Sequence, residues 1–296
     1  MDTALDMRIE DRFVTIDGLN IRYIERGEGA AVILLHGASL GSSADVFLGN
    51  LGPLAEGGRR VIAYDQPGFG LSDNPDDYGV PYRRDFFLKF MDALGLETAA
   101  LVGYSQAGAM ALGVALGNPE RLSHVIVAAG GSALPPLPPL PKDAGDAGDA
   151  KAATATAAPA APVEGREGAP SEPTIEDTRK LLEANLYHVD LITEDALALR
   201  HSRSLGKNFE AFLARGNLPS KGGGGATPVW QRLGEIKVPL MLIYGREDRA
   251  DAAARAELLK QQQPGLNIHI VEGCKHMLPW DAAAEFHRLA KDFLAG

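Results

Sequence analysis

Short apolar segments bounded by turn-forming residues recur along the chain and predict buried strands. They lie at residues 32–35, 61–64, 99–102, 122–129 and 239–244, and residues 267–271 alternate between apolar and polar positions. Near the N-terminus, residues 13–16 and 19–25 flank Asp17-Gly18, a dipeptide typical of a tight β-hairpin.

Between these segments, apolar residues recur at helical spacing. Residues 82–94 show it most clearly, with Phe86, Phe87, Phe90 and Leu94 on one face. Residues 107–116, 250–263 and 281–294 predict further helices. Because strands alternate with helices, the pattern predicts an α/β fold with a mainly parallel, doubly wound sheet.

One stretch of the chain differs in composition from the rest. Residues 134–173 are rich in Pro, Ala, Gly and Asp, cannot bury much apolar surface and are expected to be disordered. The apolar positions of residues 174–233 then predict a small helical cap, with a flexible joint at residues 222–225. Residues 1–133 and 234–296 are expected to form the two parts of the core.

Charge and cysteine content exclude several classes of partner. The 296 residues carry a net charge of −10, from 29 basic and 39 acidic side chains, which argues against nucleic acid or an anionic membrane as a partner. Cys274 is the one cysteine, so no internal disulfide forms, as suits a reducing, cytoplasmic location. No apolar run can span a bilayer, and residues 1–11 lack the apolar core of a signal peptide. No metal cluster or phosphate-binding loop is apparent, so no metal or cofactor is expected, and a homo-oligomer stays possible.

Gly103-Tyr104-Ser105-Gln106-Ala107-Gly108 carries the strongest chemical signal. A strand precedes it and an alanine-rich helix follows, so Ser105 is expected at a sharp turn with its hydroxyl exposed. The usual pattern is G-x-S-x-G, and here Ala107 takes the place of the second glycine. Taken alone, the hexapeptide could be an ordinary strand-to-helix turn.

Two later loops supply partners for this serine. Asp248 follows the strand at residues 239–244, and His276 follows the strand at residues 267–271. The carboxyl ends of parallel strands meet at one edge of a sheet, and the chain order Ser, Asp, His is that of an α/β-hydrolase. His276 would take the serine proton and Asp248 would orient the imidazole. Glu247 and Asp251 compete for the acid role, and each of these residues could also be an ordinary loop side chain.

The loop after residues 32–35 predicts the oxyanion hole. Backbone N–H groups of Ala38 and Gln106 are the expected donors to the developing negative oxygen. His36, at the start of the same loop, is interpreted as structural.

These motifs resemble the α/β-hydrolase superfamily, and within it the meta-cleavage-product hydrolases of aromatic degradation. The segments that carry the closer resemblance are Asp65 to Asp73, Gly245 to Arg249, Cys274 to His276 with Trp280 and Glu285 to Leu289, and Leu191 to Arg200 of the cap. The resemblance implies hydrolysis of a carbon–carbon bond in a vinylogous 1,5-diketone, by tautomerisation of a dienol and then serine- and histidine-dependent cleavage.

The resemblance also implies a set of substrate-binding residues. Arg200 stands where the family carries an arginine, whose planar fork suits a carboxylate; the other interpretation is a solvated helix face shared with Arg203. Three departures lie near the substrate: Tyr104 in place of asparagine, Met277 in place of tryptophan, and a loop at Ala38-Ser39 that has less glycine than usual. Tyr104 could only pack, and Met277 could only fill a gap.

Alternative functions use the same fold. A carboxylesterase or lactonase would employ the same three residues on an ester, and a cofactor-independent oxygenase would consume oxygen. A ligand-binding protein without activity is the remaining hypothesis, which the intact set of Ser105, Asp248 and His276 disfavours.

Overall fold

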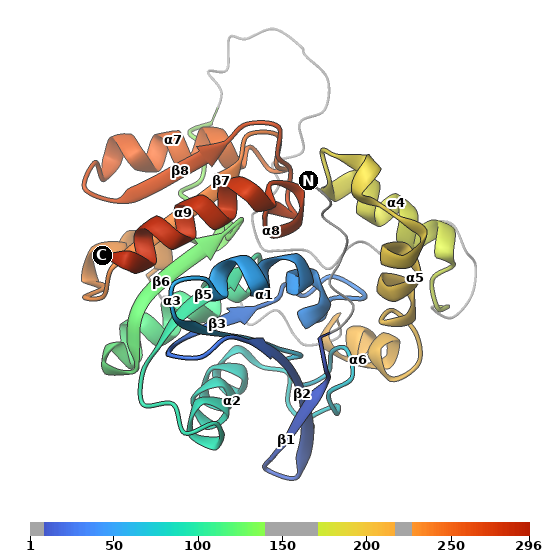
Figure 1. The fold of residues 1–296 in the computed structure, drawn as a ribbon. Helices are drawn as coiled ribbons and strands as arrows, with labels where there is room; N and C mark the ends of the chain where they lie inside the picture. Colours follow the sequence, from blue (N-terminus) through green and yellow to red (C-terminus); the bar gives the residue numbers. More distant parts are fainter. Residues whose placement is uncertain (1–8, 140–170, 217–226) are drawn as a thin grey trace, which may run out of the picture.

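The predicted alternation of strands and helices forms a single mixed sheet covered by helices on both faces (Figure 1). The computed structural model describes residues 9–139, 171–216 and 227–296. Within them the strands are β1 (Arg12–Ile16), β2 (Leu19–Arg26), β3 (Ala30–Leu35), β4 (Arg59–Tyr64), β5 (Ala99–Tyr104), β6 (Leu122–Ala128), β7 (Leu240–Gly245) and β8 (Asn267–Val271). Every predicted strand is present, and its ends lie close to those expected.

The strand order is β1-β2-β4-β3-β5-β6-β7-β8. The β1–β2 hairpin is antiparallel and β2 joins β4 antiparallel, whereas β4, β3, β5, β6, β7 and β8 pair in parallel. The predicted parallel α/β architecture is therefore confirmed, with an antiparallel edge. Because β5, β7 and β8 run in the same direction, the loops that carry Ser105, Asp248 and His276 leave the same edge of the sheet.

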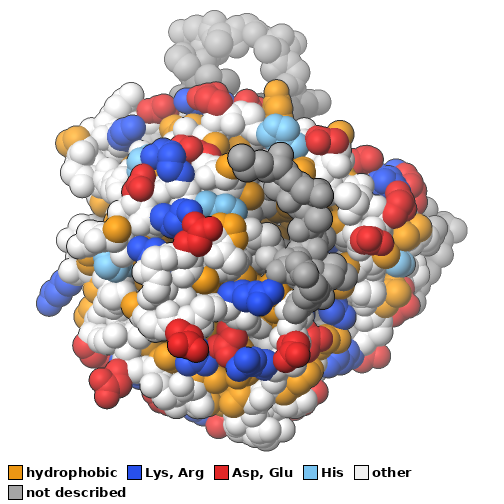
Figure 2. Space-filling view, in the orientation of Figure 1, with side chains coloured by type: hydrophobic (Ala, Val, Ile, Leu, Met, Phe, Trp, Pro, Cys, Tyr) orange, Lys and Arg blue, Asp and Glu red, His pale blue; other side chains and the backbone are white. Residues whose placement is uncertain are grey.

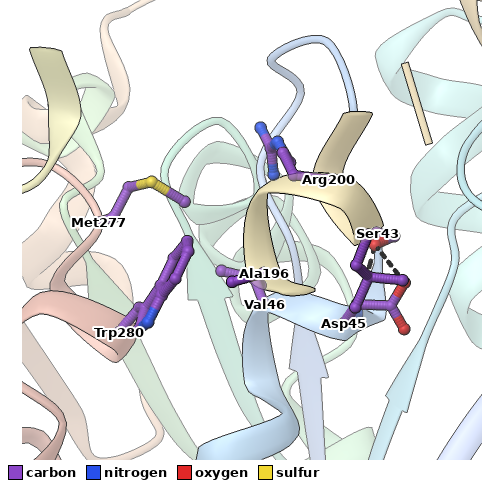
Figure 3. A pocket seen from close by; sticks show the side chains of 8 residues that line it. Ser43, Asp45, Val46, Ala196, Arg200, Met277 and Trp280 are labelled. Atoms are coloured by element: carbon purple, nitrogen blue, oxygen red, sulfur yellow. Dashed lines mark hydrogen bonds between the residues drawn. The ribbon is translucent and has the colours of Figure 1, made fainter. Parts of the chain in front are cut away.

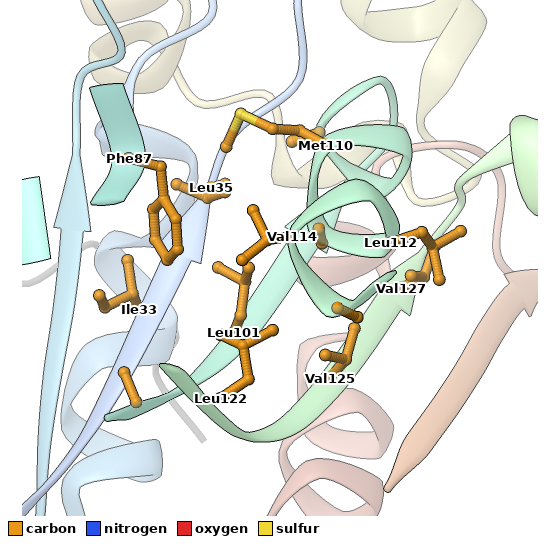
Figure 4. Close-up of a cluster of buried hydrophobic side chains, with 14 of the residues drawn as sticks. Ile33, Leu35, Phe87, Leu101, Met110, Leu112, Val114, Leu122, Val125 and Val127 are labelled. Carbon is orange, nitrogen blue, oxygen red and sulfur yellow. The ribbon is translucent and has the colours of Figure 1, made fainter. Parts of the chain in front are cut away.

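Side chains alternate between the two faces of the sheet and form two apolar clusters. Ile33, Leu35 and Leu101 pack on one face with α2 (Val80–Ala93), α3 (Ala107–Gly117) and α7 (Ala252–Gln262), as Figure 4 shows for α2 and α3. Val32, Leu34 and Val102 pack on the other face with α1 (Leu48–Ala55), α8 (Leu278–Asp281) and α9 (Ala283–Ala295). The strands thus gain burial on both sides, which explains their continuous apolar runs.

Helix α1 is a core helix that the pattern did not predict, as is the four-residue α8. Gly49, Gly52 and Pro53 are poor helix formers. Its Leu48, Leu51 and Leu54 are buried against β3 and β4, so tertiary packing outweighs the weak local preference.

Helices α4 (Ile175–Asn185), α5 (Glu194–Ser202) and α6 (Lys207–Gly216) lie together at one side of the sheet (Figure 1). A Thr174–Asp177 capping box begins α4, and Thr193 caps α5. Leu182, Leu186, Ile192 and Leu197 form a separate apolar cluster, which Met277 of the core completes. The cap is therefore helical, as expected, and packs on the loop that holds His276.

Short 3₁₀ helices fill the connections, at Ala44–Phe47, Pro119–Arg121, Gly131–Ala133, Val189–Leu191 and Val229–Glu235. Leu134 and Leu233 are both buried in the core cluster, so core packing reaches just past the predicted limits at residues 133 and 234. The domain limits themselves stay predictions. Residues 140–170 of the predicted insertion and the joint at residues 222–225 lie outside the described residues.

Acidic and basic side chains intermingle on the face shown in Figure 2, so its coloured part carries no extended patch of one sign. No helix in the described ranges is long and apolar enough to cross a membrane.

Candidate active site

Ser105 occupies a strained turn between β5 and α3. Its φ is 57°, in the left-handed region that non-glycine residues rarely adopt. The Ser105 amide donates to the Ala128 carbonyl at 2.8 Å, and the Ser105 carbonyl accepts from the Gly108 amide at 3.0 Å, so neighbouring backbone fixes the turn. Such strain costs about 1–3 kcal/mol and persists where the surroundings impose it.

The small residues of the hexapeptide have separate packing roles. A Cβ at Gly103 would lie 2.6 Å from the Ala107 carbonyl oxygen, and one at Gly108 would lie 2.7 Å from a Val127 methyl on β6. Ala107 is itself buried in the core cluster without such a conflict. The departure from G-x-S-x-G is therefore accommodated, because Gly103 and Gly108 provide the two close approaches.

The side chains of Ser105, His276 and Asp248 form one hydrogen-bonded relay. Ser105 Oγ lies 2.8 Å from His276 Nε2, and His276 Nδ1 lies 3.1 Å from both carboxylate oxygens of Asp248. An ionised carboxylate accepts only, so Nδ1 carries the proton and Nε2 is free to accept from the serine hydroxyl. The relay is largely shielded, with the His276 side chain 12% exposed and that of Asp248 3%.

Glu247 and Asp251, the alternatives for the acid role, make other contacts. Glu247 Oε2 accepts from the Cys274 amide at 2.8 Å, which ties the acid loop to the histidine loop. Asp251, with a left-handed φ of 53°, begins α7. The structure thus brings Asp248 to His276, while Glu247 holds the histidine loop in place.

The predicted oxyanion loop lies against the nucleophile. A Cβ at Gly37 would lie 3.0 Å from Ser105 Cβ and 3.3 Å from its Oγ, so the backbone next to Ala38 passes directly beside the serine. Among the described residues, the amides of Ala38 and Gln106 donate no hydrogen bond to the chain. Two unoccupied donors beside Ser105 are what a developing oxyanion requires.

His36 supports this loop as a neutral side chain. Its Nδ1 donates to the Gly37 carbonyl at 2.7 Å, and its Nε2 accepts from the Gln66 amide at 3.0 Å. Complete burial lowers the pKa of His36 to about 3, which keeps the ring uncharged. The structural interpretation of His36 fits these contacts.

Arg200 is a buried cation at the end of α5. Its Nη2 donates to Ser39 Oγ at 2.7 Å and to Ser42 Oγ at 3.4 Å, but its buried Nε has no acceptor. Within the described ranges no Asp or Glu oxygen lies within 4.0 Å of it, and burial lowers its pKa to about 10. The alternative of a solvated face shared with Arg203 is wrong: Arg200 is 8% exposed, and Arg203 is paired with Asp45 at 2.9 Å.

The loop that carries Ser39 makes room for Arg200. Gly41 has a φ of 75°, and a Cβ there would lie 2.7 Å from the Arg200 carbonyl and 3.0 Å from its Nε. A side chain at this position would push α5 away from the core. Gly41 therefore allows the cap arginine to reach the oxyanion loop.

A pocket that opens toward solvent lies between cap and core beside Arg200 (Figure 3). Val46, Leu199, Met277 and Trp280 supply its apolar wall, and Ser43, Asp45, Ala196 and Arg200 complete the lining. Met277 and Trp280 point into it from the segment after His276. Met277 thus lines the pocket besides filling the cap cluster, while Ser105 is absent from the lining.

Tyr104, the other departure near the nucleophile, is buried with its ring 5.6 Å from that of His276. Burial raises the pKa of its hydroxyl, so the group stays protonated. Its contact with the imidazole supports a packing role beside the relay.

Sequence reasoning missed Asp281. Its buried carboxylate accepts from the backbone amides of Tyr187, His188 and Lys275 at 2.7–2.9 Å, and His188 Nδ1 lies 3.1 Å from it. It therefore joins the cap segment after α4 to the residue that precedes His276. An aspartate five residues after the histidine carries no recognisable pattern, so no signal in the sequence could have identified it.

Comparison with known proteins places this geometry in a family. The model of the alpha/beta hydrolase fold matches residues 30–283. The chain belongs to the α/β-hydrolase fold family. The resemblance to meta-cleavage-product hydrolases is also confirmed by relatives of similar length.

A 2-hydroxy-6-oxo-6-phenylhexa-2,4-dienoate hydrolase of Comamonas testosteroni is 34% identical over 93% of this chain and 91% of that protein. A 2-hydroxy-6-oxononadienedioate/2-hydroxy-6-oxononatrienedioate hydrolase of the same species is 32% identical over 99% of both chains. A solved meta-cleavage product hydrolase from Pseudomonas fluorescens IP01 has a TM-score of 0.75 at 24% identity, covering 98% of this chain and 99% of its own, which shows the shared fold.

Proposed function

We propose that this protein hydrolyses the carbon–carbon bond next to the 6-oxo group of a 2-hydroxy-6-oxo-2,4-dienoate. The observation that carries the proposal is the Ser105–His276–Asp248 relay together with Arg200, a buried cation that lacks a carboxylate partner. The relatives that share a third of the sequence bear names of this activity.

Arg200 would bind the carboxylate at C1 of such a substrate. Its Nη2 already faces Ser39, and its Nε is an unoccupied donor, so a planar carboxylate could replace or join the serine hydroxyls. This contact would fix the dienol end in the pocket lined by Met277 and Trp280. The 6-oxo group, four carbons along from C2, would then extend toward Ser105.

The relay would supply the proton transfers. Tautomerisation of the dienol moves its hydroxyl proton to C5 and gives a ketone at C2. Ser105 Oγ then attacks C6 as His276 Nε2 accepts the hydroxyl proton, and the Ala38 and Gln106 amides stabilise the oxyanion. Collapse breaks the C5–C6 bond and the electron pair leaves into the dienolate, whose C2 oxygen takes the proton from His276. The 2-hydroxydienoate departs, a neutral imidazole is restored, and an acyl-enzyme remains.

Water completes the reaction at the same site. His276 would deprotonate it for attack on the acyl carbon, and collapse would return the proton to Ser105. The net change is addition of OH to C6 and H to C5. The products are a carboxylic acid that contains C6 and a 2-hydroxypenta-2,4-dienoate.

A substrate panel on the purified protein tests the proposal. Hydrolysis of 2-hydroxy-6-oxo-6-phenylhexa-2,4-dienoate, followed through the loss of its absorbance, is expected to exceed that of p-nitrophenyl acetate and of a γ-lactone in kcat/KM. Turnover of esters or lactones alone would instead establish a carboxylesterase or lactonase. Oxygen uptake during turnover would establish an oxygenase.

A further inference from the structure

Two arginines that the relay does not use contact residues close to the nucleophile in the chain or in the fold. Arg83 of α2 is 9% exposed; its Nη1 donates to Gln106 Oε1 at 3.1 Å and its buried Nε has no acceptor. Arg215, near the end of α6, donates from Nη1 to the Gly68 carbonyl at 2.8 Å, and its guanidinium lies 3.8 Å from the centre of the Phe69 ring.

The two arginines have no anionic partner in the described part of the chain. Their acceptors are neutral, and no carboxylate oxygen of residues 9–139, 171–216 or 227–296 lies within 4.0 Å of either. Burial lowers the pKa of Arg215 to about 10, and the nearby charge of Arg83 contributes to that shift. Arg83 is buried and Arg215 is half-buried, and two neighbouring cations that are partly withdrawn from water are costly unless an anion joins them.

Arg22 shows what this chain does where a buried arginine is structural. It is 3% exposed and pairs with Asp11, Asp45 and Asp65 at 2.6, 2.7 and 3.3 Å. Arg255, 6% exposed, instead donates to the backbone carbonyls of Gly131, Leu134 and Pro135. A structural arginine of this chain thus has its donors occupied, whereas the buried Nε of Arg83 has no acceptor. The contrast favours a ligand as the missing partner of Arg83 and of its neighbour Arg215.

Two independent contacts connect the pair to residues that adjoin Ser105 and the oxyanion loop. Gln106, which holds Arg83, directly follows the nucleophile. Phe69, which holds Arg215, packs on His36 with ring centres 4.8 Å apart, and His36 begins the oxyanion loop. Arg200 reaches that loop at Ser39 and lines the pocket of Figure 3, which neither Arg83 nor Arg215 lines. The site therefore has two separate positive positions.

We propose that Arg83 and Arg215 bind a second carboxylate, at the end of the acyl portion of the substrate, so that the preferred substrate is a dicarboxylate. This rests on the proposed function, in which Arg200 takes the carboxylate at C1. In 2-hydroxy-6-oxonona-2,4-dienedioate the second carboxylate is C9. Cleavage between C5 and C6 with addition of water then gives 2-hydroxypenta-2,4-dienoate and the four-carbon diacid succinate.

The test compares this dienedioate with the phenyl-terminated dienoate, which has the same C1 end and no second charge. We expect the parent protein to favour the dienedioate in kcat/KM by about 10-fold or more. Arg215→Gln and Arg83→Gln should each lower kcat/KM for the dienedioate by about 10- to 100-fold, the range for loss of a charged hydrogen bond. The phenyl substrate should lose less than about threefold.

The control is Arg232→Gln, which removes an exposed arginine paired with Glu235 and should leave both substrates unchanged. Melting temperatures of the variants establish that each is folded. Equal losses on the two substrates, or a parent that favours the phenyl substrate, would overturn the proposal.

A binding measurement separates this proposal from the proposed function. Calorimetric titration of the parent with succinate and with butyrate compares two acids of equal length that differ by one carboxylate, and it needs no turnover. Tighter binding of succinate that Arg215→Gln abolishes supports the second site even if neither dienoate is hydrolysed. Equal affinity for the two acids would refute it.

Discussion

The polar groups around Ser105 fall into two sets. They differ in how far other groups of the protein supply their hydrogen-bond and charge partners. Ser105, His276 and Asp248 follow the ends of β5, β8 and β7, respectively, and each is already hydrogen-bonded to the next. Arg200, Arg83 and Arg215 come from cap helices and α2, and none has a carboxylate partner within the described residues. The relay is thus assembled without substrate, whereas in the proposed function a charge on the substrate would pair with the arginines.

This difference predicts how substitutions act. Loss of a relay residue should affect every substrate alike, because the relay performs the bond-breaking steps. The loss of activity on replacing an arginine should depend on which end of the substrate carries a negative charge.

The largest effect is expected for Ser105→Ala. Without the nucleophile, kcat for dienoates and for any ester substrate should fall by on the order of 10⁵-fold, as for other serine hydrolase relays. Single-turnover and steady-state assays on both substrate types check it. A loss confined to one substrate type would contradict a relay common to all.

Arg200→Gln is expected to have the next largest effect. Turnover of a dienoate should fall by about 100-fold in kcat/KM, because a charged hydrogen bond to the substrate is lost and Ser39 and Ser42 lose their donor. A neutral ester such as p-nitrophenyl acetate should change by less than about threefold. Arg179→Gln, at a partly exposed position of the cap, is the control. Equal losses on both substrates would remove the proposed role of Arg200.

Asp281 connects the two sets, since it holds the cap segment and the histidine loop together. In Asp281→Asn one acceptor becomes an amide that faces backbone N–H groups. We expect kcat to fall by about 10-fold on all substrates with KM nearly constant, since lost charged hydrogen bonds here displace His276. Asp292→Asn, on the exposed face of α9, is the control. A rise in KM alone would show that Asp281 positions the cap rather than His276.

The sequence predicts those parts of the fold and site that local patterns mark, and it misses those that depend on contacts between segments far apart in the chain. The relay could be predicted because a strand followed by a turn is a local pattern. Three such patterns in parallel strands place their loops at the same edge of the sheet. Arg83, Arg215 and Asp281 gain their surroundings from segments far apart in the chain, so no local pattern marks them. Helix α1 was missed for a related reason, because long-range burial of its leucines outweighs Gly49, Gly52 and Pro53.

The smallest expected effect lies outside both sets. His287 donates to Asn50 Oδ1 at 2.9 Å, and burial lowers its pKa to about 4. The unfolded chain takes up this proton near pH 6.5, so stability is complete above that pH and declines on acidification toward pH 4. Urea titrations between pH 7 and pH 4.5 give the free energy of unfolding at each pH. In His287→Gln this free energy should change less steeply with pH, by the amount that corresponds to at most one proton taken up on unfolding. Activity at pH 7 should not change.

The thiol of Cys274 lies two residues before His276, fully buried, and burial raises its pKa. A protonated, enclosed sulfur is inert toward alkylating reagents. It reacts when this segment detaches from the rest of the protein. Since the chain has no second cysteine, the rate of alkylation under native conditions would report how often the catalytic histidine leaves its place, with no engineered label.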